Sequence, residues 1–341
     1  MIYEVLEFFL KALVIVASIA AVFVVIAMFA TKATHKSELE VEPLHEKMKE
    51  TAQFLKSFSM SKEERKVEKK KRKAEQKEKE KTQKQNPSQH EKRVFVLNFE
   101  GDLHAHQVES LREEITAILQ TATTEDEVVI KLESPGGVVH GYGLAASQLA
   151  RFRERGIPLT VCVDKVAASG GYMMAVLGNK ILAAPFAILG SIGVLAQVPN
   201  FHRILKKFDV DYKEYTAGDY KRTISLLGEI SPEGEKHFLG RLQDTHNLFK
   251  AHVHEYRPQL NVKEVANGDH WYGKEALALG LIDGIKTSDD YLMSFPPETP
   301  IFKVSYKTKE SWNEKLSQIL GKSLEKGLFQ VWSKLEKQKF F

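Results

Sequence analysis

Short apolar runs alternate with longer amphipathic stretches along the chain from residue 94 onward. The runs at 94–99, 128–133 and 159–164 are rich in β-branched residues, which is typical of buried strands. Apolar residues at helical spacing predict helices over 107–119 and 141–155. Because strands and helices alternate, we expect an α/β domain whose sheet is covered by helices.

Two further strand-forming stretches follow. Residues 181–199 are apolar enough to suggest a membrane span, but Pro185, Gly190 and Gly193 divide them into short pieces. We therefore interpret this stretch as two core strands and a turn. Another strand is predicted at 210–215, just before a glycine-containing loop.

The C-terminal part is predicted to be mainly helical. A long helix is expected over 232–256, with Pro232 in its first turn and Ser231 as its N-cap. Residues 298–341 form an amphipathic extension with apolar residues near helical spacing among lysines. Packing on a neighbouring surface is one interpretation of this extension, and membrane contact is the other.

The N-terminal segment contains an uncharged apolar run at 12–30, 19 residues long, which is close to the ~20 residues that cross a bilayer core. We interpret residues 1–31 as a membrane anchor whose span covers roughly 9–30. A cleaved signal peptide is the alternative. Its apolar region would be shorter and its flank basic, whereas Glu4 and Glu7 precede this run.

The net charge of +4 arises in one region of the chain. Residues 62–93 contain 14 Lys and Arg against 7 Asp and Glu, out of 49 and 45 in the whole sequence, so the remainder is slightly acidic. A basic groove for nucleic acid is therefore not indicated. We interpret residues 32–93 as a charged linker, either a solvated helix or a disordered tether, with adhesion to anionic lipid headgroups as the functional alternative.

The sequence gives no indication of a disulfide, a metal site or a cofactor. Cys162 is the only cysteine, and it lies in an apolar run that suits a core strand. Neither a CxxC pair nor an HExxH motif occurs, so the common zinc signatures are absent from the sequence.

Two serine-glycine motifs follow predicted strands. The first, SPGG at 134–137, can turn backbone N–H groups toward a ligand and hold the oxyanion of a tetrahedral intermediate. The second, ASGGY at 168–172, places Ser169 at a strand-to-helix turn, where its hydroxyl is either an exposed nucleophile or an N-cap. A nucleophilic serine needs a base. None of the 12 histidines has a recognisable setting, whereas Lys221 lies in the loop AGDYKRT at 217–223.

Five motifs occur in a fixed order along the chain. They are ESPGG, ASGGY, LGSIGV at 189–194, GDYK and WYGKEALALGLIDGI at 271–285. On these motifs the chain resembles the signal peptide peptidase A family of serine-lysine proteases, most closely its single-repeat branch. The similarity covers residues 94–285.

The resemblance implies a role for each matching residue. Ser169 corresponds to the nucleophile, Lys221 to the general base and Ser191 to the residue that orients the lysine amine. A lysine acts as a base only when it is neutral, so burial must lower its ordinary pKa of ~10.4 by ~3 to 5 units. We expect the apolar stretches 172–177 and 181–190 to supply this enclosure.

The resemblance also implies an oxyanion hole and an assembly. Gly136 and the amide of Gly170 form the hole, and Gly137 shapes the same loop. The implied fold is a ClpP/crotonase-like α/β spiral of ββα units, here over 94–297. Family members form homo-oligomers whose active sites face an enclosed space, sometimes with the base supplied across a repeat boundary. One complete motif set in this chain indicates that each subunit can hold its own pair.

The implied activity is endopeptidase cleavage of signal peptide remnants or unfolded polypeptides, without a cofactor. Two alternatives stay open: a crotonase-like acyl-CoA enzyme, and a membrane-anchored scaffold that has lost catalysis. The lysines that follow the expected span favour a cytoplasmic catalytic domain by the positive-inside rule. The relatives nevertheless carry theirs beyond the inner membrane, and we expect this one on the periplasmic face.

Overall fold

The computed structural model describes residues 38–67, 70 and 92–307. The membrane span expected at 12–30 lies outside these residues, as does most of the C-terminal extension. Within the described ranges, no helix combines the length and the apolar character that crossing a bilayer requires.

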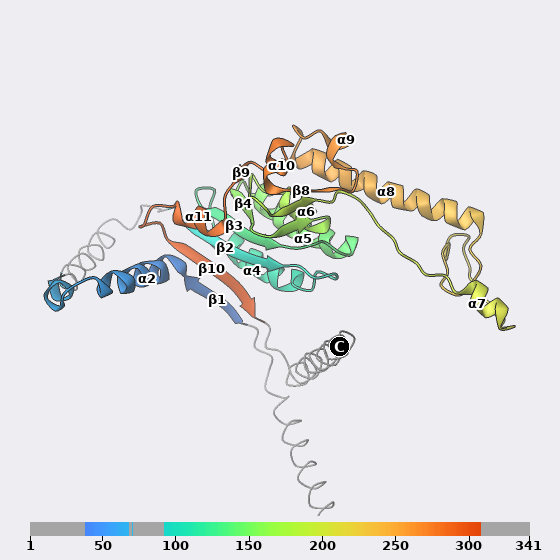
Figure 1. Ribbon diagram of the computed structural model, residues 1–341, viewed down its shortest axis with the longest axis horizontal. Coiled ribbons are helices and arrows are strands. Elements are labelled where there is room, and N and C mark those ends of the chain that lie inside the picture. Colours follow the sequence, from blue (N-terminus) through green and yellow to red (C-terminus); the bar gives the residue numbers. More distant parts are fainter. Residues whose placement is uncertain (1–37, 68–69, 71–91, 308–341) are drawn as a thin grey trace, which may run out of the picture. The chain divides into compact units, whose positions relative to one another are not determined.

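A seven-stranded sheet forms the centre of the described part of the chain, in the order β1, β10, β2, β3, β4, β6, β9 (Figure 1). The pairs from β10 to β9 are all parallel. This arrangement confirms the predicted α/β class. The strand bounds are Glu38–Pro43 (β1), Ile301–Lys307 (β10), Val94–Glu100 (β2), Glu127–Glu133 (β3), Leu159–Val163 (β4), Lys180–Ala183 (β6) and Gly284–Ile285 (β9).

A smaller sheet of three strands is also present in the described chain, and its order is β5, β7, β8. Strands β5 (Val166–Ala168) and β7 (Ile188–Gly190) are parallel, and β8 (His270–Tyr272) is antiparallel to β7. An isolated bridge pairs Ser134, directly after β3, with Ala167 of β5. The segment that follows β3 is therefore attached to the edge of the small sheet.

Helices follow most of these strands. The bounds are Leu44–Phe58 (α2), Val108–Thr121 (α4), Val139–Glu154 (α5), Gly170–Ala175 (α6), His202–Lys207 (α7), Pro232–Tyr256 (α8), Val262–Val265 (α9), Gly273–Ala278 (α10) and Ser288–Met293 (α11). One order repeats along the chain: a strand of the large sheet, a short segment in the small sheet, then a helix. It is seen for β4, β5 and α6, and again for β6, β7 and α7.

The large sheet is buried on both faces. In β2, Phe95, Leu97 and Phe99 belong to the main core, together with apolar residues of α4, α5 and α6. The alternate residues Val94 and Val96 belong to a smaller core, which includes residues of β10 and α11. Side chains of a strand alternate between faces, so continuous apolar runs of this kind are expected in a parallel sheet covered on both sides.

Most sequence-predicted elements are present. The predicted strands at 94–99, 128–133 and 159–164 correspond to β2, β3 and β4, and the helices over 107–119 and 141–155 correspond to α4 and α5. Within 181–199, two short strands form instead of a membrane span, as expected.

The long helix α8 also begins as predicted. Its N-cap, Ser231, accepts a hydrogen bond from the backbone N–H of Gly234 at 3.0 Å, and Pro232 lies in its first turn. Cys162 is fully buried in β4, as expected of a core residue.

Three boundaries differ from those expected. The strand predicted at 210–215 was wrong: these residues are irregular and exposed, so their apolar side chains meet no sheet. The range 32–93, interpreted as a linker, contains β1 and α2. The range 298–341, interpreted as an extension, begins with β10, which joins the large sheet. Strands at a sheet edge depend on distant partners, so local sequence does not reveal them.

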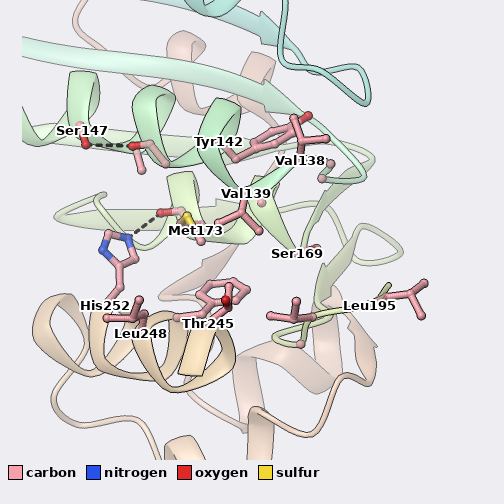
Figure 2. A pocket seen from close by; sticks show the side chains of 18 of the residues that line it. Val138, Val139, Tyr142, Ser147, Ser169, Met173, Leu195, Thr245, Leu248 and His252 are labelled. Carbon is pink, nitrogen blue, oxygen red and sulfur yellow. Dashed lines mark hydrogen bonds between the residues drawn. The ribbon is translucent and has the colours of Figure 1, made fainter. Parts of the chain in front are cut away.

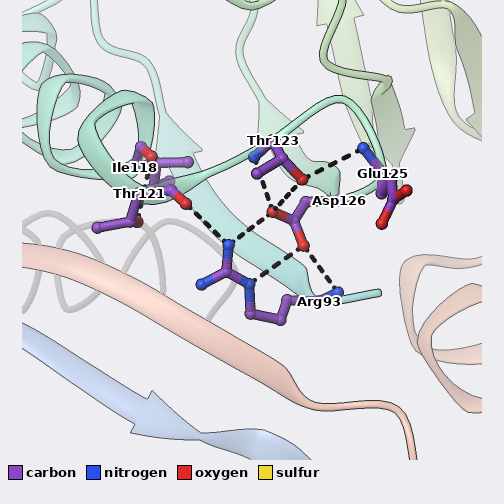
Figure 3. A network of polar contacts seen from close by, with 6 residues as sticks. All are labelled: Arg93, Ile118, Thr121, Thr123, Glu125 and Asp126. Carbon is purple, nitrogen blue, oxygen red and sulfur yellow. Dashed lines mark hydrogen bonds and ion pairs between the residues drawn. The ribbon is translucent and has the colours of Figure 1, made fainter. Parts of the chain in front are cut away.

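An ion pair fixes the start of β2 against the turn before β3 (Figure 3). Arg93 donates from Nη2 to Asp126 Oδ2 at 2.7 Å, and from Nε and the backbone N–H to Oδ1. The backbone N–H of Thr123 donates to the same carboxylate at 2.8 Å. Burial of the Asp126 carboxyl raises its pKa, but the hydrogen bonds from Arg93 and Thr123 outweigh this and hold the pKa well below its usual range.

Replacing Asp126 by Asn is expected to lower the free energy of unfolding at pH 7 by about 1–3 kcal/mol, because buried donors lose their charged acceptor. Since the pKa of Asp126 is depressed in the folded state, its contribution is present above the unfolded value of about 3.9 and is lost as the pH falls below it. Urea titrations should therefore show a variant deficit that shrinks below about pH 4. The exposed carboxylate variant Glu113→Gln is the control, and a deficit independent of pH would contradict this account.

Candidate active site

Ser169 occupies a strained turn between β5 and α6. Its backbone angles are φ 52° and ψ −119°, a left-handed conformation that non-glycine residues rarely adopt. The backbone N–H of Ser169 donates to the Gly190 carbonyl at 2.8 Å, and its carbonyl accepts from Met173. Its side chain makes no capping hydrogen bond. Ser169 thus occupies the N-cap position of α6 without capping the helix through its side chain, and it lines a pocket.

The loop after β3 lies directly against this turn. Gly136 has φ 90°, and a Cβ added there would lie 2.7 Å from both the Ser169 Cβ and the Gly170 nitrogen. A side chain at Gly136 would therefore require Ser169 or Gly170 to move. The structure thus brings together two motifs that stand more than thirty residues apart in the sequence.

Glycines of both motifs line the same pocket as Ser169. The N–H of Gly136 donates to Ser134 Oγ at 3.1 Å, so this amide is already used. The amides of Gly137 and Gly170 donate to no acceptor in the described part of the chain, and both residues line the same pocket as Ser169. Among the described residues the amides of Gly137 and Gly170 are therefore without an acceptor, whereas the Gly136 amide, which the family resemblance assigns to an oxyanion hole, donates to Ser134.

Tyr142, which the sequence analysis did not single out, supports both motifs. It is fully buried in α5, and a Cβ added to Gly170 would lie 2.4 Å from its ring. Its hydroxyl contacts Ser134 Oγ at 2.6 Å and donates to the Asp102 carbonyl at 2.8 Å. Burial raises the pKa of the Tyr142 phenol above its ordinary value, so the group stays protonated at neutral pH.

An apolar pocket of about 660 Å³ opens beside Ser169 (Figure 2). Its walls come from α5, α6, α8 and the segment after β7. The side chains that make it apolar include Val138, Val139, Met173, Leu195, Leu248 and Phe249. A pocket of this size and character accepts an apolar side chain of a substrate rather than a charged group.

His252 fixes one wall of the pocket. Its Nε2 lies 2.9 Å from the carbonyl of Met173, which joins α8 to α6 one turn after Ser169 (Figure 2). A carbonyl can only accept, so this ring nitrogen carries the proton. Tyr142, Met173 and His252 were missed because each becomes visible only when α5, α6 and α8 pack together. One sequence signal could have pointed to Tyr142 and His252: each is a side chain with a polar end on an otherwise apolar face of a helix.

Ser191 lies next to Gly190, the residue that binds the backbone of Ser169. It follows Gly190, whose carbonyl accepts from Ser169, and its own backbone N–H donates to Asp269 at 2.7 Å. Ser191 also has a positive φ of 51°, so both serines are held in unusual backbone conformations. The structure therefore places Ser191 near Ser169, as the motifs implied.

Lys221 is not brought to Ser169 within one chain. It is exposed, in the irregular segment 208–230, and it is not among the residues that line the pocket. Its neighbour Tyr220 stacks on His237 of α8 with ring centroids 3.8 Å apart. His237 lies eight residues before Thr245, the first residue of α8 that reaches the pocket, which corresponds to about 12 Å along the helix. The expected enclosure of this lysine by 172–177 and 181–190 is absent in the single chain.

The segment that carries Lys221 is largely exposed. We name residues 194–230, between β7 and α8, the arm. It includes α7, which lies near the N-terminal end of α8 and away from the sheets (Figure 1). Tyr215 is 88% exposed and Phe208 is 71% exposed. Other exposed apolar side chains of the arm are Leu195, Val198, Phe201, Ile204, Val210, Tyr212, Tyr220 and Leu226.

Among the described residues, no group of three or more His, Cys, Asp or Glu side chains is arranged to hold a metal ion.

Sequence comparisons place the chain among peptidases. The model of the N-terminal region of peptidase family S49 matches residues 1–149, and the model of peptidase family S49 matches residues 151–296. A protein of Haemophilus influenzae called probable protease SohB is 48% identical over 319 residues, which cover 91% of this chain and 90% of that protein.

Two proteins of Buchnera aphidicola with the same name are also similar. The one from subspecies Acyrthosiphon pisum is 48% identical over 242 residues, covering 71% of this chain and 72% of that protein. The one from subspecies Schlechtendalia chinensis is 55% identical over 207 residues, covering 61% and 68%. These matches confirm the family resemblance drawn from the five motifs, including its single-repeat SohB branch.

The contact between Gly136 and Ser169 gives a direct test of the site. We expect Gly136→Ala to slow the reaction of Ser169 with a serine-directed fluorophosphonate by roughly 100-fold, because the added methyl group displaces the loop that carries the free Gly137 amide. The matched control is Gly240→Ala in α8, where an added Cβ meets nothing within 4 Å. Labelling of Gly136→Ala at the wild-type rate would contradict this geometry.

Proposed function

Because the chain belongs to peptidase family S49, we propose that it is a serine endopeptidase in which Ser169 attacks the substrate carbonyl. The observation that carries this proposal is the Ser169 turn itself. A strained serine, whose side chain makes no capping hydrogen bond, lines an apolar pocket together with Gly137 and Gly170, whose amides donate to no acceptor among the described residues. This is the arrangement that acyl transfer through a serine nucleophile requires.

The proposed reaction follows from these positions. Ser169 Oγ attacks the peptide carbonyl while a lysine amine takes its proton. The amides of Gly137 and Gly170 stabilise the negative charge on the carbonyl oxygen. The tetrahedral intermediate collapses, the lysine returns the proton to the leaving amine, and water then hydrolyses the acyl-enzyme by the same route.

We propose that the base is Lys221 of a neighbouring copy of the chain. In one chain this residue lies on the arm, and the arm exposes many large apolar side chains. Exposed apolar surface of this extent is typical of a protein–protein interface. If the arm packs across a neighbouring subunit, the head-to-tail contact repeats around a closed ring.

Ser191 fits this proposal as the partner of the incoming amine. It lies beside Ser169 and is partly exposed, so a lysine from a second copy can reach it. Packing at such an interface removes water from an amine, which favours its neutral form. The sequence-based expectation that each subunit holds its own pair is replaced by a pair shared between two subunits.

The pocket supports a polypeptide substrate with an apolar side chain near the cleaved bond. Signal peptide remnants and unfolded polypeptides both have this character. The repeated order of strand, short strand and helix is consistent with a ClpP/crotonase-like spiral of ββα units, the fold expected from the family.

Anchoring in the bacterial inner membrane is also part of the proposal. It is supported by the uncharged apolar run at 12–30, whose length suits a single span. The catalytic domain is proposed to lie on the periplasmic face, because long domains translocate regardless of the charge that follows a span.

A mixing experiment tests whether the pair is shared. Ser169→Ala and Lys221→Ala should each abolish hydrolysis of an apolar fluorogenic peptide, because each removes one member of the pair from every site. When the two variants are co-expressed in equal amounts, about a quarter of the interfaces join an intact Ser169 to an intact Lys221, so about a quarter of wild-type activity should return.

Two outcomes would contradict the proposal. Near-wild-type activity of either single variant would remove that residue from the reaction. Absence of recovery in co-assembled variants, with size-exclusion chromatography showing mixed oligomers, would show that the pair lies within one chain. The doubly substituted chain, mixed with itself, is the matched control and should stay inactive.

A further inference from the structure

Resting on the serine protease proposed above, we propose that Tyr142 is the positioning residue of the oxyanion hole and holds both of its halves. Its hydroxyl acts on the Gly136–Gly137 loop through Ser134, and its ring supports Gly170. Tyr142 donates no hydrogen bond to the Ser169 hydroxyl or to a substrate oxyanion, so its effect on the reaction is indirect.

A series of hydrogen bonds, each with a fixed donor and acceptor, leads from the Gly136–Gly137 loop to Tyr142. The Asp102 carbonyl can only accept, so the Tyr142 hydroxyl donates to it. The phenol has a single proton, so its oxygen accepts from the Ser134 hydroxyl at 2.6 Å. The Ser134 oxygen in turn accepts from the Gly136 amide. Each hydroxyl donates once and accepts once, and no alternative direction satisfies both ends of the chain.

Ser134 also connects this series of hydrogen bonds to the Ser169 turn. Its backbone N–H donates to Val166 at 2.8 Å, and its carbonyl accepts from Ala168 at 3.0 Å. These two bonds tie Ser134 to β5, the strand that ends directly before Ser169. The backbone of Ser134 is therefore fixed relative to the nucleophile, and Tyr142 fixes the direction of its hydroxyl.

The hydroxyl of Ser134 sets the direction of the oxyanion loop. By accepting from the Gly136 amide it fixes the peptide plane between Pro135 and Gly136. The Gly137 amide is one residue further along; it donates to no acceptor in the described part of the chain, and Gly137 lines the pocket. A change in the Ser134 hydroxyl therefore alters the aim of the Gly137 donor.

Tight packing leaves these groups little freedom. A Cβ at Gly101 would lie 2.4 Å from both Ser134 Oγ and the Tyr142 hydroxyl, and a Cβ at Gly170 would lie 2.4 Å from the Tyr142 ring. The Tyr142 ring thus packs against Gly170, one oxyanion donor, while its hydroxyl acts through Ser134 on the loop that carries Gly137, the other donor. A tyrosine is required for both functions, since phenylalanine supplies the ring alone.

Tyr142→Phe separates the two functions, because it keeps the ring and deletes the hydroxyl. In the full-length protein we expect kcat for an apolar fluorogenic peptide to fall about tenfold, less than the loss of an entire oxyanion donor. KM should stay within about twofold, because ground-state binding uses the pocket walls. The inhibition constant of a peptide aldehyde, whose hemiacetal oxygen occupies the oxyanion site, should rise by about the same factor as kcat falls. The matching peptide alcohol, which forms no hemiacetal, should bind unchanged.

Two further variants complete the test. Ser134→Ala removes the next hydroxyl in this series of hydrogen bonds. The double variant Tyr142→Phe/Ser134→Ala should have the same kcat as the less active of the two single variants, because both substitutions interrupt the same series. Tyr172→Phe is the control: this tyrosine is also fully buried and also donates to a carbonyl, that of Leu281 at 2.8 Å, but it does not line the pocket. We expect Tyr172→Phe to keep the wild-type kcat and aldehyde affinity.

The inference is overturned if Tyr142→Phe retains wild-type kcat and aldehyde affinity, or if Tyr172→Phe shows the same losses. It is also overturned if aldehyde and alcohol weaken equally, which would indicate a distorted pocket. These results are distinct from failure of the proposed function, which would appear as full activity of Ser169→Ala.

Discussion

The contact between the loop after β3 and the turn after β5 is the constraint on which the site depends. Gly136 lies so close to Ser169 and Gly170 that a single methyl group between them has no room. The contact is possible because Ser134 pairs with β5 and because β3 and β4, which lead into the two motifs, are neighbours in the large sheet. The sheet therefore sets the distance between the Ser134–Gly137 loop and the Ser169 turn.

The same architecture keeps Lys221 out of the pocket that Ser169 lines. Helix α8 supplies a pocket wall through its C-terminal half, while the arm lies near its N-terminal end, with Tyr220 stacked on His237. Lys221 is thereby held away from the Ser169 of its own chain. A lysine that becomes neutral and close to a serine only after assembly would couple proteolysis to oligomer formation, which protects a cell from activity of the free subunit.

Sequence was sufficient for the parts of the fold that depend on local pattern. The buried strands β2, β3 and β4, the helix α8 with its Ser231 cap, and the nucleophile turn were all predicted from periodicity and short motifs. Sequence failed at 210–215, where alternating apolar residues suggested a strand but form part of an exposed arm. The sequence pattern also did not predict β1 and β10, because each forms only by pairing with a strand that is distant in the sequence. Tyr142 and the use of the Gly136 amide by Ser134 could not be predicted, because both arise from the packing of α5 against two separate loops.

The central claim is that one subunit supplies the nucleophile and another the base. The most direct test is a cryo-electron microscopy structure of the assembled full-length protein, in which the distance from each Lys221 Nζ to the nearest Ser169 Oγ is measured. The account predicts a hydrogen-bond distance of about 3 Å between residues of two neighbouring copies, with Ser191 beside the amine. A Lys221 amine that faces solvent in every copy, or that reaches the Ser169 of its own chain, would contradict it.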